Sequence, residues 1–160
     1  MAVILITLIF PNDLENWKRF DGVGKQFLFV SDEMENSEAK LFCASLNARL
    51  FEPRDQDITK LVINQAKTEG IELIWLGIHN KAIERTDFVH NSDNQPIEWN
   101  DWSNANGDQC SISESGCNDC AIVDLDDNGE WYDYPCSAYT DAVVCERDTQ
   151  GNRYKPKYVK

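Results

Sequence analysis

The C-terminal half of this chain lacks positive charge. No lysine or arginine occurs from Thr86 to Glu146, although that stretch of 61 residues contains 14 of the 28 acidic residues of the chain. The whole chain of 160 residues has 15 basic residues and a net charge of −13. Because so negative a protein repels phosphate groups, we do not expect it to bind nucleic acid or anionic membranes.

The chain also lacks a hydrophobic run long enough to span a membrane. Residues 1–10 are apolar except for Thr7, and Pro11 ends the run well short of the roughly 20 residues that a spanning helix needs. We expect residues 1–16 to be the remnant of a secretory leader or a first strand, although no basic residue precedes the run. With no internal repeat, residues 17–147 are predicted to form one domain, and residues 148–160 a solvated basic tail.

The sequence also lacks the set of paired cysteines and histidines that a zinc site needs. The pair Cys117 and Cys120 has the C-x-x-C spacing, but there is no second such pair, and His79 and His90 lie far upstream. We therefore expect disulfides, and with them an oxidising, extracellular compartment, rather than zinc. The six cysteines allow 15 pairings: Cys43, Cys110, Cys117, Cys120, Cys136 and Cys145.

Two helices are predicted in the first half of the domain. Ser37 can cap the first helix, and Asp55 can cap the second, which is expected to end at Gly70. Short β-like runs are found on either side of the helices and beyond them, which indicates an α+β fold with antiparallel sheets. These runs are 26–30, 72–78, 121–125 and 142–145.

A hairpin is predicted around Asn128-Gly129, which separates residues 121–125 from residues 130–134. The sequence Asp124 to Gly129 also matches the opening of an EF-hand loop, D-x-D-x-N-G. The loop would need a bidentate glutamate at its twelfth position, where this chain has Pro135, so the hairpin is the better interpretation.

The dense acidic residues favour a bound cation. Like charges this close together cost stability unless they face water or share a counter-ion, and Ca²⁺ suits carboxylate and amide oxygens in irregular loops. The alternative is an acidic surface that only keeps the protein soluble.

Four motifs, in this order, make the chain resemble the C-type lectin-like domain family over most of residues 17–147. The resemblance implies the family fold of two helices, antiparallel sheets and a long ligand-binding loop. The motifs are the opening Trp17–Phe20 with Gly24–Phe27, the core motif Trp75–Ile78, the segment Gly129–Asp133 with Cys136, and the closing Val143–Glu146.

The resemblance also implies disulfide pairing and the short form of the domain. Cys43 would pair with Cys145 and Cys120 with Cys136, which leaves Cys110 to pair with Cys117 in the long loop. No cysteine precedes Trp17, so the additional N-terminal disulfide of longer relatives is absent from this sequence.

In the family, Ca²⁺ in the long loop binds two vicinal sugar hydroxyls, and the metal ligands also hydrogen-bond the sugar. This chain departs from the usual ligand motifs: Tyr132 precedes Asp133 where an amide is expected, Asn118 stands before Asp119 where a carboxylate is expected, and residues 103–109 contain no proline. Asn106 and Asp108 can still supply oxygens. The predicted carbohydrate-binding residues are Asn106, Asp108, Asn118, Tyr132 and Asp133.

Two further calcium positions are implied by the resemblance. Asn80, Glu84 and Asp119 fall near an auxiliary loop site, and Asp57 and Glu146 fall near a site between the second helix and the last strand. Ordinary exposed acidic residues are the alternative for each. The complete set of predicted metal ligands is Asp108, Asn118, Asp119, Asp133, Asn80, Glu84, Asp57 and Glu146.

Among the aromatic residues, Trp75 and Trp102 are predicted to belong to the core, whereas Trp99, Trp131 and Tyr132 could offer a face to a sugar ring. For Trp131 the resemblance implies a core position instead, because the equivalent residue of the family is buried. Tyr132 is the better candidate, since its ring can stack and its hydroxyl can hydrogen-bond.

The sequence thus predicts a secreted domain that recognises an extracellular glycan or glycoprotein through Ca²⁺. The alternative is a calcium-independent module that binds a protein surface. An enzyme is not expected: acid pairs such as Asp126 and Asp127 follow from composition, and there is no G-x-S-x-G motif or P-loop. The sugar, the number of ions and the oligomeric state have no signal in the sequence.

Overall fold

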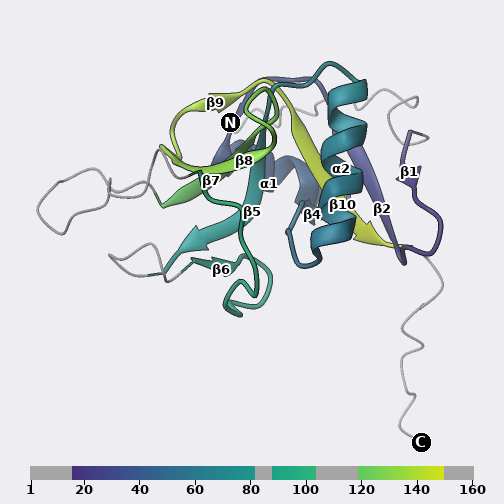
Figure 1. The fold of residues 1–160 in the computed structure, drawn as a ribbon, viewed down its shortest axis with the longest axis horizontal. Coiled ribbons are helices and arrows are strands. Elements are labelled where there is room, and N and C mark those ends of the chain that lie inside the picture. Colours follow the sequence, from purple (N-terminus) through teal and green to yellow (C-terminus); the bar gives the residue numbers. More distant parts are fainter. Residues whose placement is uncertain (1–15, 82–87, 104–118, 150–160) are drawn as a thin grey trace, which may run out of the picture.

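The computed structural model describes residues 16–81, 88–103 and 119–149, and they form an α+β fold with two helices and antiparallel sheets, as predicted. The first sheet has the order β1-β2-β10-β4 and the second sheet the order β6-β5-β7-β8 (Figure 1). The first sheet consists of β1 (Lys18–Arg19), β2 (Lys25–Val30), β10 (Val143–Asp148) and β4 (Arg49–Leu50). The second consists of β6 (Phe88–His90), β5 (Leu73–Asn80), β7 (Cys120–Asp124) and β8 (Glu130–Tyr134).

The beginning and the end of the domain meet in the first sheet. Strand β10 pairs antiparallel with β2 along its whole length, from Val143 opposite Val30 to Asp148 opposite Lys25. A separate two-stranded sheet of β3 (Met34–Glu35) and β9 (Tyr139–Thr140) lies at the start of the first helix. The predicted strands are all present, within one to three residues at each end.

Helix α1 (Asn36–Ser45) begins earlier than predicted, because Glu35 rather than Ser37 is its N-cap. The Glu35 backbone N–H donates to the Glu38 carboxylate at 3.0 Å, and the Glu35 side chain accepts in return, which is a capping box. The pairing of β3 with β9 holds Glu35 opposite Tyr139, so this tertiary contact sets where the helix can start.

Helix α2 (Gln56–Thr68) is capped by Asp55, as predicted, through its carboxylate and the backbone N–H of Ile58 at 2.9 Å. The chain leaves the helix at Gly70, whose φ of +74° suits glycine. In Figure 1 this helix lies across the first sheet in front of β10.

The predicted hairpin joins β7 to β8. Asn128 and Gly129 both have positive φ, 58° and 81°, as expected. The connection is longer than a two-residue turn, since the last paired residues are Asp124 and Glu130. The Asp124 carboxylate accepts the backbone N–H groups of Asp126 and Asp127 and so stabilises this five-residue loop.

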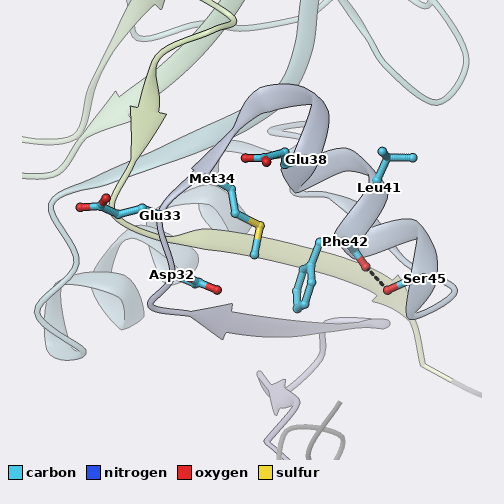
Figure 2. Close-up of a pocket in the computed structure, with 7 residues that line it drawn as sticks. All are labelled: Asp32, Glu33, Met34, Glu38, Leu41, Phe42 and Ser45. Atoms are coloured by element: carbon cyan, nitrogen blue, oxygen red, sulfur yellow. Dashed lines mark hydrogen bonds between the residues drawn. The ribbon is translucent and has the colours of Figure 1, made fainter. Parts of the chain in front are cut away.

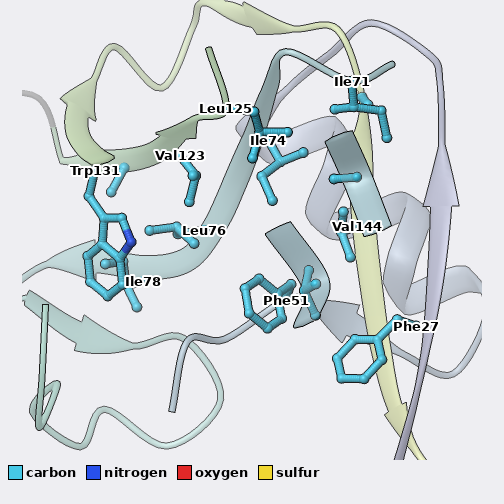
Figure 3. Packing of buried hydrophobic residues seen from close by; sticks show 14 of the residues in the cluster. Phe27, Phe51, Ile71, Ile74, Leu76, Ile78, Val123, Leu125, Trp131 and Val144 are labelled. Carbon is cyan, nitrogen blue, oxygen red and sulfur yellow. The ribbon is translucent and has the colours of Figure 1, made fainter. Parts of the chain in front are cut away.

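The core lies between the two sheets and α2. Leu76, Ile78 and Trp131 of the second sheet belong to the same buried cluster as Phe51 and Val144 (Figure 3). Trp75 and Trp131 are fully buried, which confirms both core predictions, and Trp102 packs against the same cluster partly buried. At Gly77 the strand passes so close to residues 50–52 that an added Cβ would lie 2.7 Å from the Leu50 carbonyl oxygen.

Two of the three expected disulfides are present: Cys43–Cys145, which ties α1 to β10, and Cys120–Cys136. Cys110 and Cys117 lie outside the described residues. Within the described ranges, neither helix is both long and apolar enough to cross a membrane.

Candidate functional site

Two predicted ligands, Asn80 and Asp119, meet at one end of the second sheet. The backbone N–H of Asn80 donates to the carbonyl oxygen of Asp119 at 2.9 Å, next to the pairing of His79 with Cys120. We call this end, where Asn80, Phe88, Cys120 and Tyr134 are paired, the loop end of the second sheet. Asn80 is buried and Asp119 is exposed there.

A third predicted ligand, Asp133, lies near the same end of the sheet. Asp133 lies opposite Ala121, so these two side chains face the same way, and Asp119 precedes β7 directly, two residues before Ala121. Asn80, opposite Asp119, belongs to this end as well. Strand pairing therefore places one amide and two carboxylates, from three different stretches of chain, at the same end of the sheet.

A cluster of aromatic rings packs next to the loop end of the second sheet. Trp131, two residues before Asp133, is fully buried. Its ring contacts those of Trp99 and Trp102, with centroids 4.9 and 5.5 Å away, and Phe88 lies 4.8 Å from Trp102. Trp99 is thus half-buried against the core, which leaves it less available for a sugar than its position in the sequence indicates.

The segment around Trp102 is attached to the edge of the second sheet. The Trp131 N–H donates to the Asp101 carbonyl at 2.8 Å, and the Ser103 N–H donates to the Trp131 carbonyl at 3.0 Å. This pairing is parallel, so the chain at Ser103 runs along β8 toward the loop end. Residues 103 and 119, which flank the undescribed segment 104–118, are therefore both held by this sheet.

Tyr132 lies on the opposite face from Asp133, because neighbouring side chains alternate along a strand. It packs against the second hydrophobic cluster, around Trp75 and Ile122, and its hydroxyl donates to the Asp127 carboxylate of the hairpin loop. That carboxylate raises the pKa of the Tyr132 hydroxyl. The structure thus does not bring Tyr132 and Asp133 together on one face, and a stacking role for Tyr132 stays a prediction.

Glu146 is fully buried and has two cationic partners. Its carboxylate accepts from Arg49 Nε at 2.9 Å and lies 3.2 Å from Lys25 Nζ. Burial raises the pKa of Glu146, and the two cations oppose that rise. Asp57 is exposed on the first turn of α2. The two cations already neutralise Glu146, and the calcium site predicted for Asp57 and Glu146 stays a prediction.

The remaining predicted ligands, Glu84, Asn106, Asp108 and Asn118, lie outside the described residues. Among residues 16–81, 88–103 and 119–149, no three histidine, cysteine or acidic side chains lie close enough to hold a metal ion by themselves. A site at the loop end would therefore combine the described residues there with residues from the undescribed segments.

Comparisons with known proteins agree with this architecture. A family model described as the Lectin C-type domain matches residues 32–147. Collectin-11 of Danio rerio is 26% identical over 124 residues, which cover 78% of this chain and 43% of that protein. The chain thus spans less than half the length of this curated relative.

Solved structures show the same fold. The carbohydrate-recognition domain of the human scavenger receptor C-type lectin has a TM-score of 0.70 and 21% identity, and the match covers 84% of this chain and 98% of that one. The C-type carbohydrate-recognition domain of cow CD23, in the presence of a GlcNAc2Man3 oligosaccharide, has a TM-score of 0.68 and 22% identity, with coverage of 84% and 95%. At this identity the likeness shows the fold alone.

Proposed function

Because the chain belongs to the C-type lectin domain family, a family of binding domains rather than enzymes, we propose that it recognises carbohydrate through Ca²⁺ at the loop end of the second sheet. The observation that carries this proposal is the position of Asn80, Asp119 and Asp133 together at the loop end of the second sheet. These residues come from three stretches of chain, and Asp119 and Asp133 belong to the acidic segment from Thr86 to Glu146 that contains no lysine or arginine.

The donor set fits a hard divalent cation. Asn80, Asp119 and Asp133 offer only amide and carboxylate oxygens, and the nearest cysteine, Cys120, is tied up in a disulfide. Calcium accepts six to eight such oxygens in irregular arrangements, whereas zinc prefers nitrogen and sulfur. Asp108, Asn118 and Glu84 would complete the ligands, and Asn106 and Asp108 would contact sugar.

Bound Ca²⁺ would supply a positive charge and free coordination positions for two sugar hydroxyls. The protein's part is to hold its oxygens in place before the sugar arrives. The ladder between β5, β7 and β8, the Cys120–Cys136 disulfide and the tryptophan cluster all restrain the loop end of the second sheet. Such preorganisation lowers the entropy cost of binding.

The expected partner is an extracellular glycan or glycoprotein. Secretion is part of the proposal, and the two disulfides support it, because disulfides persist in oxidising compartments. The oligosaccharide present in the structure of the CD23 domain supports the choice of carbohydrate as ligand class.

A glycan array probed with and without EGTA tests the proposal. Calcium-dependent binding to a defined set of glycans is the expected result, and excess calcium should restore binding after chelation. A folded protein that binds no glycan in either condition would contradict it.

A calcium-independent protein-binding module is the second candidate. The observation that favours it is Tyr132, which occupies the place of an expected amide ligand and directs its hydroxyl to Asp127 instead. Isothermal titration calorimetry separates the two: heat of calcium binding supports the first, whereas its absence from a folded domain supports the second.

A further inference from the structure

A groove lies along α1, on elements that the proposed sugar site does not use. Met34, Leu41 and Phe42 form its apolar part, and its volume is about 550 Å³. Figure 2 shows the Met34 and Phe42 side chains extending into the space between α1 and the segment that precedes it. The other residues that line it are Asp32, Glu33, Glu38 and Ser45.

The groove is held in shape by contacts with the core. The Trp75 indole N–H donates to the Met34 carbonyl oxygen at 2.9 Å, and Met34 pairs with Thr140 across β3 and β9. The capping box between Glu35 and Glu38 holds the start of α1. A ligand would therefore meet a formed surface rather than one that must first fold.

The chemistry of the groove is apolar and negative. Asp32, Glu33 and Glu38 give it three carboxylates, and no lysine or arginine lines it. Leu41 is 73% exposed, the most exposed large apolar side chain among the described residues. Such a surface fits a cationic segment that also carries apolar or aromatic side chains.

We propose that the groove binds residues 150–160 of the same chain. This segment alternates positive and aromatic residues: Arg153, Tyr154, Lys155, Lys157, Tyr158 and Lys160. It has four basic residues and no acidic one, which complements the three carboxylates of the groove. The basic tail would then be a ligand of its own domain rather than a solvated end.

The described end of the chain lies within reach of the groove. The Asp148 carboxylate lies 4.0 Å from the Arg49 guanidinium. Arg49 is four residues after Ser45, which lines the end of the groove. Four residues span at most about 15 Å, whereas the eleven residues of the segment can extend over roughly 36 Å. Attachment to the domain also gives the segment a high effective concentration, so weak contacts suffice.

Other occupants fit less well. Residues 1–15 are mainly apolar and contain no lysine or arginine, so they leave the three carboxylates without a counter-charge. The same segment of a second copy would have equal chemistry, but it lacks the advantage of attachment.

Amide NMR spectra of the 160-residue chain and of a variant ending at Thr149 test the proposal. We expect the amides of residues 32–34 and 41–45 to differ between the two, at every protein concentration. A synthetic peptide with the sequence of residues 150–160, added to the shortened protein, should shift the same amides back. Raising the salt concentration from about 0.05 M to about 0.5 M should weaken the binding of the peptide, because salt screens exposed charges.

Variants with a matched control make the test specific. The double variant Asp32→Lys, Glu33→Lys should lower the affinity of the shortened protein for the peptide about tenfold, because two attractions become repulsions. Glu69→Lys with Asp126→Lys makes the same change in charge on exposed sites elsewhere and should stay within about twofold. Leu41→Asp should also weaken the binding of the peptide, whereas Leu61→Asp on α2 should leave it unchanged. All six residues are exposed, so folding should persist.

Four results would overturn the proposal: groove amides unaffected by removal of residues 150–160, equal weakening by the control pair, shifts that follow removal of residues 1–15 instead, or shifts that disappear on dilution. The last two would assign the groove to the N-terminal segment or to a second copy. The groove shares no residue with the loop end of the second sheet, so the glycan array and this experiment fail independently.

Discussion

The backbone of Asn80 is hydrogen-bonded to that of Asp119 at 2.9 Å, although 39 residues separate them in the sequence. This bond closes the loop end of the second sheet and sets two predicted metal ligands next to each other. Asp133, opposite Ala121 and next to the paired Tyr134, lies at the same end of the sheet.

Removing one carboxylate from the loop end of the second sheet should weaken the binding of calcium. Asp119→Asn and Asp133→Asn, measured separately by calorimetry, should each lower calcium affinity by at least about tenfold, because calcium affinity follows the number of charged ligands. Asp126→Asn in the hairpin loop is the matched control and should bind calcium as the parent does. Equal losses in all three would point to a general effect of net charge instead.

Gly77→Ala should destabilise the fold. The added Cβ would lie 2.7 Å from the Leu50 carbonyl oxygen and 2.9 Å from Glu52 Cγ, and the backbone there cannot move without disturbing both sheets. We expect a loss of about 1–3 kcal/mol in urea denaturation. Gly24→Ala, where the added Cβ meets nothing within 4 Å, should cost much less. If the two variants denature alike, the close approach at Gly77 does not limit stability.

Glu146→Gln should destabilise the protein with or without calcium. The neutral side chain leaves Lys25 and Arg49 without their shared buried partner. Because those two side chains are 21% and 37% exposed, we expect about 1–3 kcal/mol, less than for a fully buried pair. Asp148→Asn, on a residue 74% exposed, is the control. A loss seen only when calcium is present would instead support the metal site predicted for Asp57 and Glu146.

Stability should fall as the pH drops below 6.5, in part because of His90. Its ring is buried, its Nδ1 has no hydrogen-bond partner, and burial, with the charge of Arg54, lowers its pKa from the ordinary 6.5. Glu52, Asp93 and Glu98 oppose this shift only partly. The unfolded chain therefore takes up a proton at a higher pH than the folded one, and stability is lost from about pH 6.5 down to the folded pKa.

His90→Gln should flatten this pH dependence in urea denaturation between about pH 7 and pH 5. The same substitution at His79, the other histidine of the chain, is the control. Should both variants keep the steep dependence of the parent, the carboxylates rather than His90 would be responsible.

Local features of the fold were predictable because neighbouring residues decide them. Asp55 caps α2, Gly70 ends it, and Asn128-Gly129 takes positive φ in the β7–β8 connection, as the residue types demand. The start of α1 was wrong, since the pairing of Glu35 with Tyr139 overrides the stronger capping preference of Ser37.

The candidate site was only partly predictable. Motif positions nominate Asn80, Asp119 and Asp133, and the structure places them at one end of the second sheet, but no pattern in the sequence indicates that the Tyr132 hydroxyl bonds to Asp127. The packing of Trp99 against Trp131 likewise has no signal in the sequence, and a sugar-stacking role for Trp99 stays a prediction.

The order of the motifs in the sequence indicated the family, the resemblance to that family implied the two described disulfides, and composition alone gave the acidic stretch from Thr86 to Glu146. Only the tertiary structure decided that Glu146 is buried between Lys25 and Arg49, 121 and 97 residues away. It also decided that α1 carries an acidic groove beside an exposed Leu41. Both depend on which distant strands pair, and the pairing energy comes from burial summed over the whole domain rather than from any local run of residues.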